Sequence, residues 1–142
     1  MISTKWFQGK EESHNYIEIR KKVFNSELLI KEKITDIYDE FAFNVVIYED
    51  EIPAGTGRLL FKEGKYFIDK VCVLKEFRDN NYSDLIIRML IRKAVNIGAD
   101  KTYAMIQNEY IKIFEKIGFV EVNKENEGVL MMKEGDVGGH CC

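Results

Sequence analysis

The chain has 142 residues, of which 46% are hydrophobic and 32% charged, and its formal net charge is −3. These values fit one globular domain and exclude disordered, collagen-like and coiled-coil proteins. The slight acidic excess argues against general nucleic-acid binding, which normally goes with basic charge. No apolar run approaches the ~18 residues of a membrane helix. Because the first ten residues show no signal-peptide pattern and the three cysteines form no disulfide framework, we expect a cytoplasmic protein with no membrane partner.

The first half of the chain alternates between helical and extended patterns. Apolar spacing predicts a strand at 4–8, helices at 13–24 and 29–38, and strands at 43–48, 55–61 and 66–74. The strand at 66–74 is apolar on both faces, which favours a central position covered on both sides.

The second half predicts a strand–helix–strand crossover followed by a hairpin. A helix at 83–97 ends at Gly98, a strand covers 101–106, and a short helix capped by Asn108 ends at Gly118. Residues 120–122 and 129–132 form the hairpin. The pattern predicts an α+β fold, with a mixed, mostly antiparallel sheet of six to seven strands and about four helices. We expect one domain over 1–134 and a frayed, Gly-rich tail over 135–142.

The segment 71–83 carries the clearest chemical pattern. A strand ends there, a polar loop follows, and the longest helix begins. Free amides at a helix N-terminus bind anions, and Arg78 adds a cation, so the segment predicts a phosphate site. An ordinary turn with a surface arginine stays open as the alternative, because glycine is usual where backbone contacts phosphate.

The same segment resembles the acyl-CoA-binding motif of the GCN5-related N-acetyltransferase (GNAT) superfamily, Arg/Gln-x-x-Gly-x-Gly/Ala after a Val-x-Val strand. Arg78 matches its first position and Ser83 is a small residue at its last, whereas Asn81 replaces the middle glycine. Asparagine tolerates a left-handed backbone better than most residues. Elements similar to those of small bacterial members follow the family's order at Ile19 to Phe24, Gly55 to Leu59 and Ile113 to Phe119.

The resemblance implies an acetyl-CoA-dependent N-acetyltransferase that acts directly on a primary amine of a small molecule or peptide. The cofactor's pantetheine arm would pair with the backbone of this strand, and its pyrophosphate would bind the loop amides. The expected cofactor contacts are Val71, Cys72, Val73, Arg78, Asp79, Asn80, Asn81, Tyr82, Ser83, Asn108 and Phe114. We expect no nucleic-acid partner, and a homodimer stays open.

Two residues are candidates for proton transfer. Asp69 lies inside an apolar strand, where burial would raise its pKa toward that of a general base; an ion pair with Arg58 or a strand-edge position is the alternative. Family members commonly carry a tyrosine where Phe114 stands. Tyr110, one helical turn earlier, is therefore the candidate acid, unless it only lines the cleft or core.

Other acidic residues and the cysteines support weaker hypotheses. Glu40 and Asp39 are alternative bases, and with Asp36 they form an acidic cluster that either attracts a cationic amine or is a solvated surface. Cys72 is predicted to be a small core residue.

Two further functions stay open. The departures at Asn81 and Phe114, and a final hairpin without the histidine that related proteins often carry, would fit a non-catalytic acyl-CoA-binding or interaction domain. The tail residues His140, Cys141 and Cys142 would fit a metal- or redox-responsive protein, or be incidental.

Overall fold

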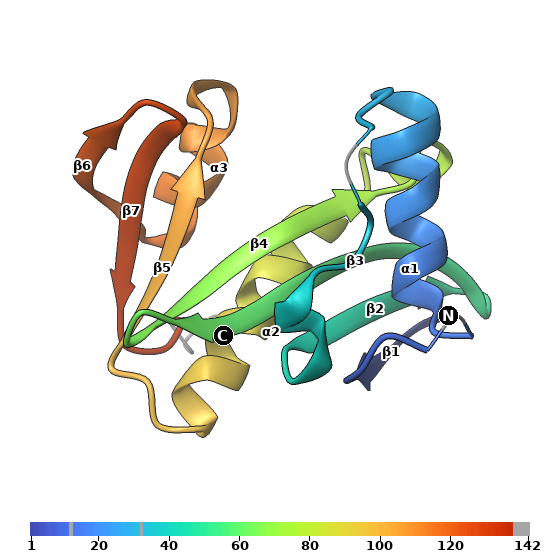
Figure 1. The fold of residues 1–142 in the computed structure, drawn as a ribbon, viewed down its shortest axis with the longest axis horizontal. Coiled ribbons are helices and arrows are strands. Elements are labelled where there is room, and N and C mark those ends of the chain that lie inside the picture. Colours follow the sequence, from blue (N-terminus) through green and yellow to red (C-terminus); the bar gives the residue numbers. More distant parts are fainter. Residues whose placement is uncertain (12, 32, 138–142) are drawn as a thin grey trace.

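A seven-stranded sheet organises the protein. The computed structural model describes residues 1–11, 13–31 and 33–137. The strands are β1 (Ile2–Phe7), β2 (Phe43–Glu49), β3 (Ile52–Lys62), β4 (Lys65–Val73), β5 (Lys101–Ile106), β6 (Val120–Glu125) and β7 (Gly128–Glu134). They lie in the order β1-β2-β3-β4-β5-β7-β6, and every neighbouring pair is antiparallel except β4 and β5 (Figure 1). The predicted mixed, mostly antiparallel sheet is confirmed.

Helices cover both faces of this sheet. Helix α1 (Asn15–Arg20) continues directly into the π-helix η1 (Lys21–Glu27), and both lie on one face (Figure 1). Helices α2 (Tyr82–Asn96) and α3 (Ile111–Ile117) pack on the other face. Single 3₁₀ turns occur at η2 (Ile37–Glu40), η3 (Lys75–Phe77) and η4 (Asn108–Tyr110).

The helix predicted at 29–38 is wrong. The described residues between Leu28 and Asp36 contain no helix, and only the turn η2 follows. Leu28, Leu29 and Ile37 are 52%, 74% and 76% exposed, so their helical spacing buries no apolar face. A helix this short needs tertiary packing to form, and of the apolar residues in this segment Ile34 alone packs against one of the buried hydrophobic clusters of the described residues.

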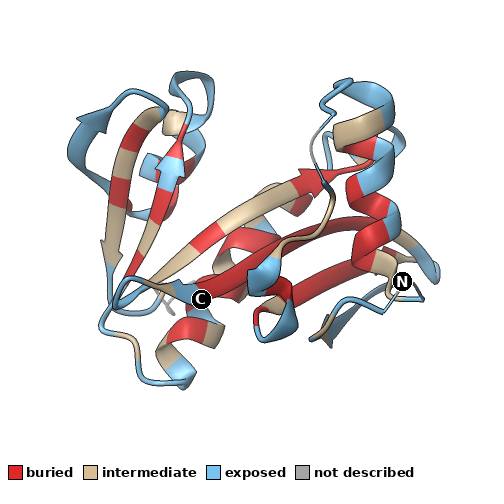
Figure 2. Ribbon diagram, viewed as in Figure 1, coloured by how far each residue is buried: buried red, intermediate tan, exposed pale blue. Residues whose placement is uncertain are grey.

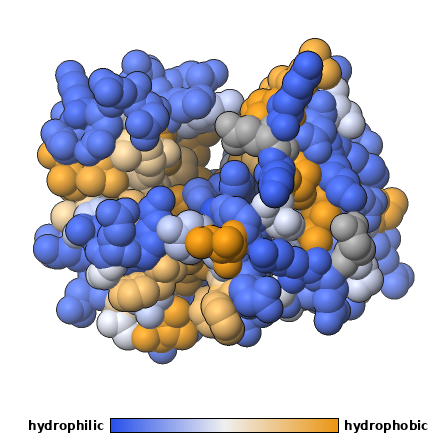
Figure 3. Space-filling model, in the orientation of Figure 1, coloured by the Kyte–Doolittle hydropathy of each residue, from blue (hydrophilic) through white to orange (hydrophobic). Residues whose placement is uncertain are grey.

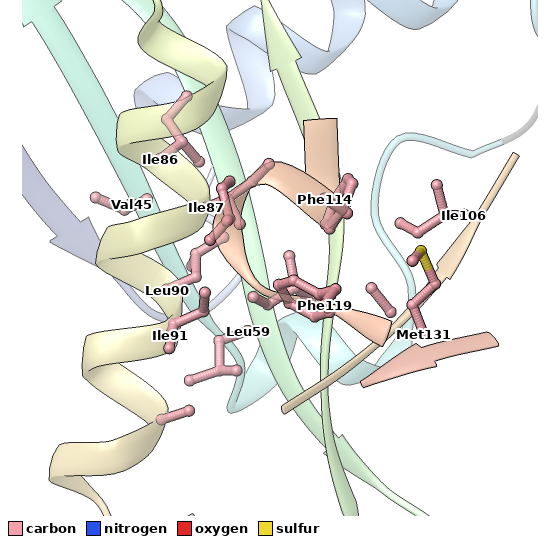
Figure 4. Close-up of a cluster of buried hydrophobic side chains, with 14 of the residues drawn as sticks. Val45, Leu59, Ile86, Ile87, Leu90, Ile91, Ile106, Phe114, Phe119 and Met131 are labelled. Carbon is pink, nitrogen blue, oxygen red and sulfur yellow. The ribbon is translucent and has the colours of Figure 1, made fainter. Parts of the chain in front are cut away.

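The main hydrophobic core lies between the sheet and α2. Ile86, Ile87, Leu90 and Ile91 of α2 point toward the sheet and toward the aromatic pair of Phe114 and Phe119 (Figure 4). A second, smaller core joins α1 and η1 to the opposite face; it contains Tyr16, Ile17, Ile19, Val23, Val46, Tyr48, Cys72 and Leu74. Burial is greatest in β2 and β3, whereas β6 is exposed along its whole length (Figure 2). The central strands are therefore held from both sides.

The first residues of the expected tail pack against the body of the protein. The amide of Gly135 donates to the carbonyl of Asp100 at 3.0 Å, and Val137 lies against the main core. Residues 138–142, with the candidate ligands His140, Cys141 and Cys142, lie outside the described residues. Within the described ranges, no helix combines the length and apolar character that crossing a membrane requires.

The contact between β3 and α2 generates a stability prediction at Gly57. A Cβ at this position would lie 2.6 Å from a methyl group of Ile86 and 2.9 Å from one of Leu90. The Ile86 methyl is on a branched Cβ and has little freedom to move. We therefore expect Gly57→Ala to lower the free energy of unfolding by about 1–3 kcal/mol in urea titrations. Ser3→Ala on the exposed β1 is the control; equal stability of the two variants would contradict this packing.

Candidate active site

The central feature of the site is the parting of β4 from β5. The two parallel strands pair only at Tyr66–Thr102 and Phe67–Tyr103. Beyond that point β4 stays paired with β3, and β5 with β7, so the facing edge of β4 has no strand partner. Figure 1 shows the strands diverging, and Figure 3 shows the surface hollowed between the β5–β7–β6 arm and the α1 side. An unpaired strand edge of this kind can accept an extended ligand through backbone hydrogen bonds.

A β-bulge interrupts β4 beside this open edge. The register with β3 shifts between Thr56–Cys72 and Arg58–Asp69, and Lys70 adopts a positive φ of 54°. A bulge locally bends a strand and redirects its side chains. Residues 71–73 beyond it form the open edge.

Cys72 belongs to the smaller core. Its side chain is 7% exposed and packs with residues of α1 and η1. Burial raises the pKa of its thiol to about 12, which keeps it in the unreactive thiol form. The prediction of a small core residue is confirmed. Its backbone, and not its side chain, belongs to the open edge of β4.

The loop from β4 to α2 presents free amides. Among the hydrogen bonds of the described residues, none uses the amides of residues 79–83 as donors. Asp79 and Asn81 have φ values of 76° and 60°, so Asn81 adopts the left-handed backbone expected at the family's glycine position. The side chain of Tyr82 turns away from the loop and donates to a carboxylate oxygen of Glu49. The loop therefore offers its backbone, at the positive end of a 15-residue helix, to an anion.

Arg78 has two partners in the described residues, Glu27 and Val73. Its two terminal nitrogens donate to the two carboxylate oxygens of Glu27, each at 2.6 Å, and its Nε donates to the carbonyl of Val73 at 3.0 Å. The hydrogen bond from Arg78 lowers the pKa of Glu27, and the bond to Glu27 raises that of Arg78. Sequence reasoning missed Glu27, because the partners are 51 positions apart and no local pattern links them.

A buried charge network lies under α1. Arg20 is fully buried and donates to both carboxylate oxygens of Asp39 at 3.0 and 3.1 Å, and to Asn44 at 2.7 Å. Burial raises the pKa of Asp39, but the hydrogen bond and charge of Arg20 outweigh it, so the pKa lies below its ordinary value. The solvated-surface interpretation of the acidic cluster is therefore wrong for Asp39. It holds for the exposed Glu40.

Asp69 lies in the same network, at its accessible edge. Both of its carboxylate oxygens accept hydrogen bonds from the buried Arg58 at 2.8 Å, which is the ion pair foreseen as the alternative to a free base. Arg58 also donates to Asp36 at 2.6 Å. The Asp69 and Asp36 side chains stay 40% and 41% exposed, whereas Arg58 is 2% exposed. Asp69 lies two residues after Phe67, the last β4 residue paired with β5. Asp69 is therefore where the two strands begin to part.

The structure separates the residues expected near the departing thiolate. Tyr110 is the last residue of η4, between β5 and α3, and its side chain is 47% exposed. Phe114 is 7% exposed and its ring packs edge-to-face on Phe119, with centroids 5.1 Å apart, so it belongs to the main core. Asn108 begins η4 and lines a separate pocket of about 460 Å³ beneath the β6–β7 turn. Tyr110 is thus the phenol that this arm offers to the cleft.

Within the described ranges, no three His, Cys, Asp or Glu side chains come together in an arrangement that could hold a metal ion.

Comparison with known proteins agrees with this geometry. The acetyltransferase (GNAT) domain family matches residues 9–132. The chain belongs to the GNAT family of acetyltransferases. Among its relatives, the uncharacterized N-acetyltransferase YjcF of Bacillus subtilis is 26% identical over 114 residues, which are 79% of this chain and 81% of YjcF.

Solved structures show the same GNAT fold. Escherichia coli ElaA superposes with a TM-score of 0.82 at 18% identity, over 94% of this chain and all of ElaA (100%). The PaiA N-acetyltransferase of Thermoplasma acidophilum, solved with coenzyme A, has a TM-score of 0.71 at 13% identity, over 94% of this chain and 99% of PaiA. At these identities the likeness establishes the fold, and the roles of individual residues rest on the geometry above.

The buried pair of Arg20 and Asp39 predicts acid sensitivity. Because the pKa of Asp39 is lower in the folded than in the unfolded state, its stabilisation is present above about pH 4 and is lost as the pH falls toward the folded value. We expect Asp39→Asn to lower the free energy of unfolding at pH 7 by about 3 kcal/mol and to flatten its decline in acid. Urea titrations between pH 7 and pH 3 measure both effects. An unchanged acid slope would contradict the pairing, and Asp100→Asn on the surface is the control.

Proposed function

We propose that this GNAT protein transfers the acetyl group of acetyl-CoA directly to a primary amine of a small molecule or peptide. One observation carries the proposal: the open edge of β4 leads into a loop of free amides at the N-terminus of α2. Coenzyme A joins a pantetheine arm to a pyrophosphate. Its arm would bind the strand edge and its pyrophosphate the loop amides, in the order in which the chain presents them. That PaiA was solved with coenzyme A supports the cofactor class.

Each part of the cofactor has a matching surface. The pantetheine amides would pair with the backbone of Val71 and Val73, as an added strand pairs with a sheet edge. The pyrophosphate would accept hydrogen bonds from the amides of residues 79–83, with Arg78 beside it. This arrangement places the thioester near the point where β4 and β5 part, next to Asp69.

The transfer step requires proton movements at both ends. The amine nitrogen attacks the thioester carbonyl carbon and forms a C–N bond. The C–S bond then breaks, the thiolate of coenzyme A leaves, and the acetyl group remains on the amine. The nitrogen must lose a proton, which we assign to Asp69, directly or through water. The thiolate must gain a proton, which we assign to Tyr110 on the opposite wall. The half-exposed Asp36 and Asp69 also favour a cationic acceptor, because an acidic site attracts an ammonium group.

A second function has one observation in its favour. Phe114, where family members commonly carry a tyrosine, has no hydroxyl group and is buried in the main core. An acyl-CoA-binding domain without transfer activity would bind the cofactor through the same loop and leave every amine unmodified. The cytoplasmic location remains a prediction from the sequence, and a homodimer stays open.

Arg78 provides the test of cofactor binding. We expect Arg78→Gln to weaken acetyl-CoA binding about 10- to 100-fold in calorimetry, because a charge-assisted hydrogen bond to the pyrophosphate is lost. Arg88→Gln is the matched control, because it removes one positive charge from the partly exposed Arg88 of α2, outside the loop. We expect it to bind acetyl-CoA as the wild type does. Equal affinities of the two variants would remove Arg78 from the pyrophosphate site.

Turnover and amine affinity test the two proton-transfer residues. At saturating amine, we expect Asp69→Asn and Tyr110→Phe each to lower kcat about 100-fold with little change in the KM of the amine. A raised KM for the amine with an unchanged kcat would make Asp69 a binding group. A Tyr110→Phe enzyme with wild-type turnover would show that the thiolate is protonated by water.

A further inference from the structure

The ion pair of Glu27 and Arg78 joins the N-terminal helix to the loop before α2. We infer that Glu27 is a latch on the cofactor loop: its carboxylate holds Arg78 in an ion pair that acyl-CoA must displace to bind, and the displacement frees η1. This inference rests on the proposed binding of the pyrophosphate at residues 79–83. It adds a residue that sets cofactor affinity and links the cofactor side of the cleft to the acceptor side.

The contacts of Arg78 show why release is needed. Both terminal nitrogens donate to Glu27, and Nε donates to the carbonyl of Val73, which is part of the open strand edge. The guanidinium thus uses three of its five N–H donors, and Glu27 occupies the two terminal nitrogens that would bind a phosphate in the same bidentate way. A pyrophosphate at the neighbouring amides would also bring negative charge against the Glu27 carboxylate. Like charges at such distances repel, so the ion pair and the bound cofactor compete for Arg78.

Glu27 lies at the end of η1, where few apolar contacts hold the chain. It is the last residue of this seven-residue π-helix; such helices are rare and are frequent at functional sites. Leu28 and Leu29 are exposed, and Leu29 has a φ of 57°, an unfavourable conformation for a residue with a branched side chain. Local hydrogen bonds hold this end: the amides of Leu28 and Ile30 donate to the carbonyls of Val23 and Phe24 at 2.9 and 2.8 Å, and the Asn25 side-chain amide donates to the carbonyl of Ile30 at 2.7 Å. The ion pair with Arg78 connects this end to the cofactor loop.

The same helix forms a wall of the acceptor side. Val23 of η1 packs with Cys72 and Leu74 at the end of β4, and Lys70 lies 5.9 Å from the centre of the Phe24 ring. The amine would approach the thioester beside these residues. Displacement of Glu27 would therefore act on this wall as well as on the cofactor loop.

Calorimetry with coenzyme A tests the latch. We expect Glu27→Gln, which removes the charge with little change in shape, to bind coenzyme A about three- to fivefold more tightly than the wild type. Glu18→Gln is the matched control, because it breaks an exposed ion pair with Lys22 on the same helical segment, away from Arg78. Circular dichroism confirms that both exposed substitutions leave the fold intact.

Amide hydrogen exchange is a second test. A contact with a purely structural role would not lead to faster exchange at η1 when the ligand binds. We expect coenzyme A to increase exchange at residues 21–29 in the wild type, and Glu27→Gln to show the increase without ligand. If the wild type binds coenzyme A but Glu27→Gln binds it equally or more weakly, or if the ligand protects 21–29, the latch is overturned and the proposed function stands. If no variant binds millimolar coenzyme A, the proposed function fails and the latch fails with it.

Discussion

The parting of β4 from β5 is the constraint on which the rest of the site depends. Each strand keeps a full antiparallel partner on its other side, so the sheet can open between them without losing its cohesion. The opening leaves backbone groups at the end of β4 without a strand to bind, and α2 begins only nine residues after β4 ends. One extended ligand can therefore satisfy the strand edge and the helix N-terminus together.

Charge is arranged around this opening on two levels. Arg20 of α1 and Arg58 of β3 are buried cations. Both form ion pairs with the carboxylates of Asp36, Asp39 and Asp69, as burial of charge requires. Removing one partner would leave an uncompensated buried charge, which makes this network important for the position of α1 and of the segment before β2. At the surface, Glu27 and Arg78 form a pair that a ligand can break at low cost, because both side chains remain partly hydrated.

The local chemistry of several elements could be predicted from the sequence. The seven strands, α2 and the loop at Asn81 follow from apolar alternation, helical spacing and the left-handed tolerance of asparagine. The helix expected at 29–38 failed, because its apolar residues had the right spacing but no surface to cover. The partner of Asp69 was foreseen only as an alternative to a catalytic role.

The amino-acid sequence by itself determined the type and order of the strands, the family and the position of the helix N-terminus that we propose as the anion site, since these depend on short-range spacing, turn chemistry and helix signals. The tertiary structure decided which charges meet. Arg78 finds Glu27 across 51 positions, and Arg20 finds Asp39 from another element. Such pairs depend on how α1 crosses the sheet, which the packing of the smaller core determines. Periodicity within one element contains no information about that crossing.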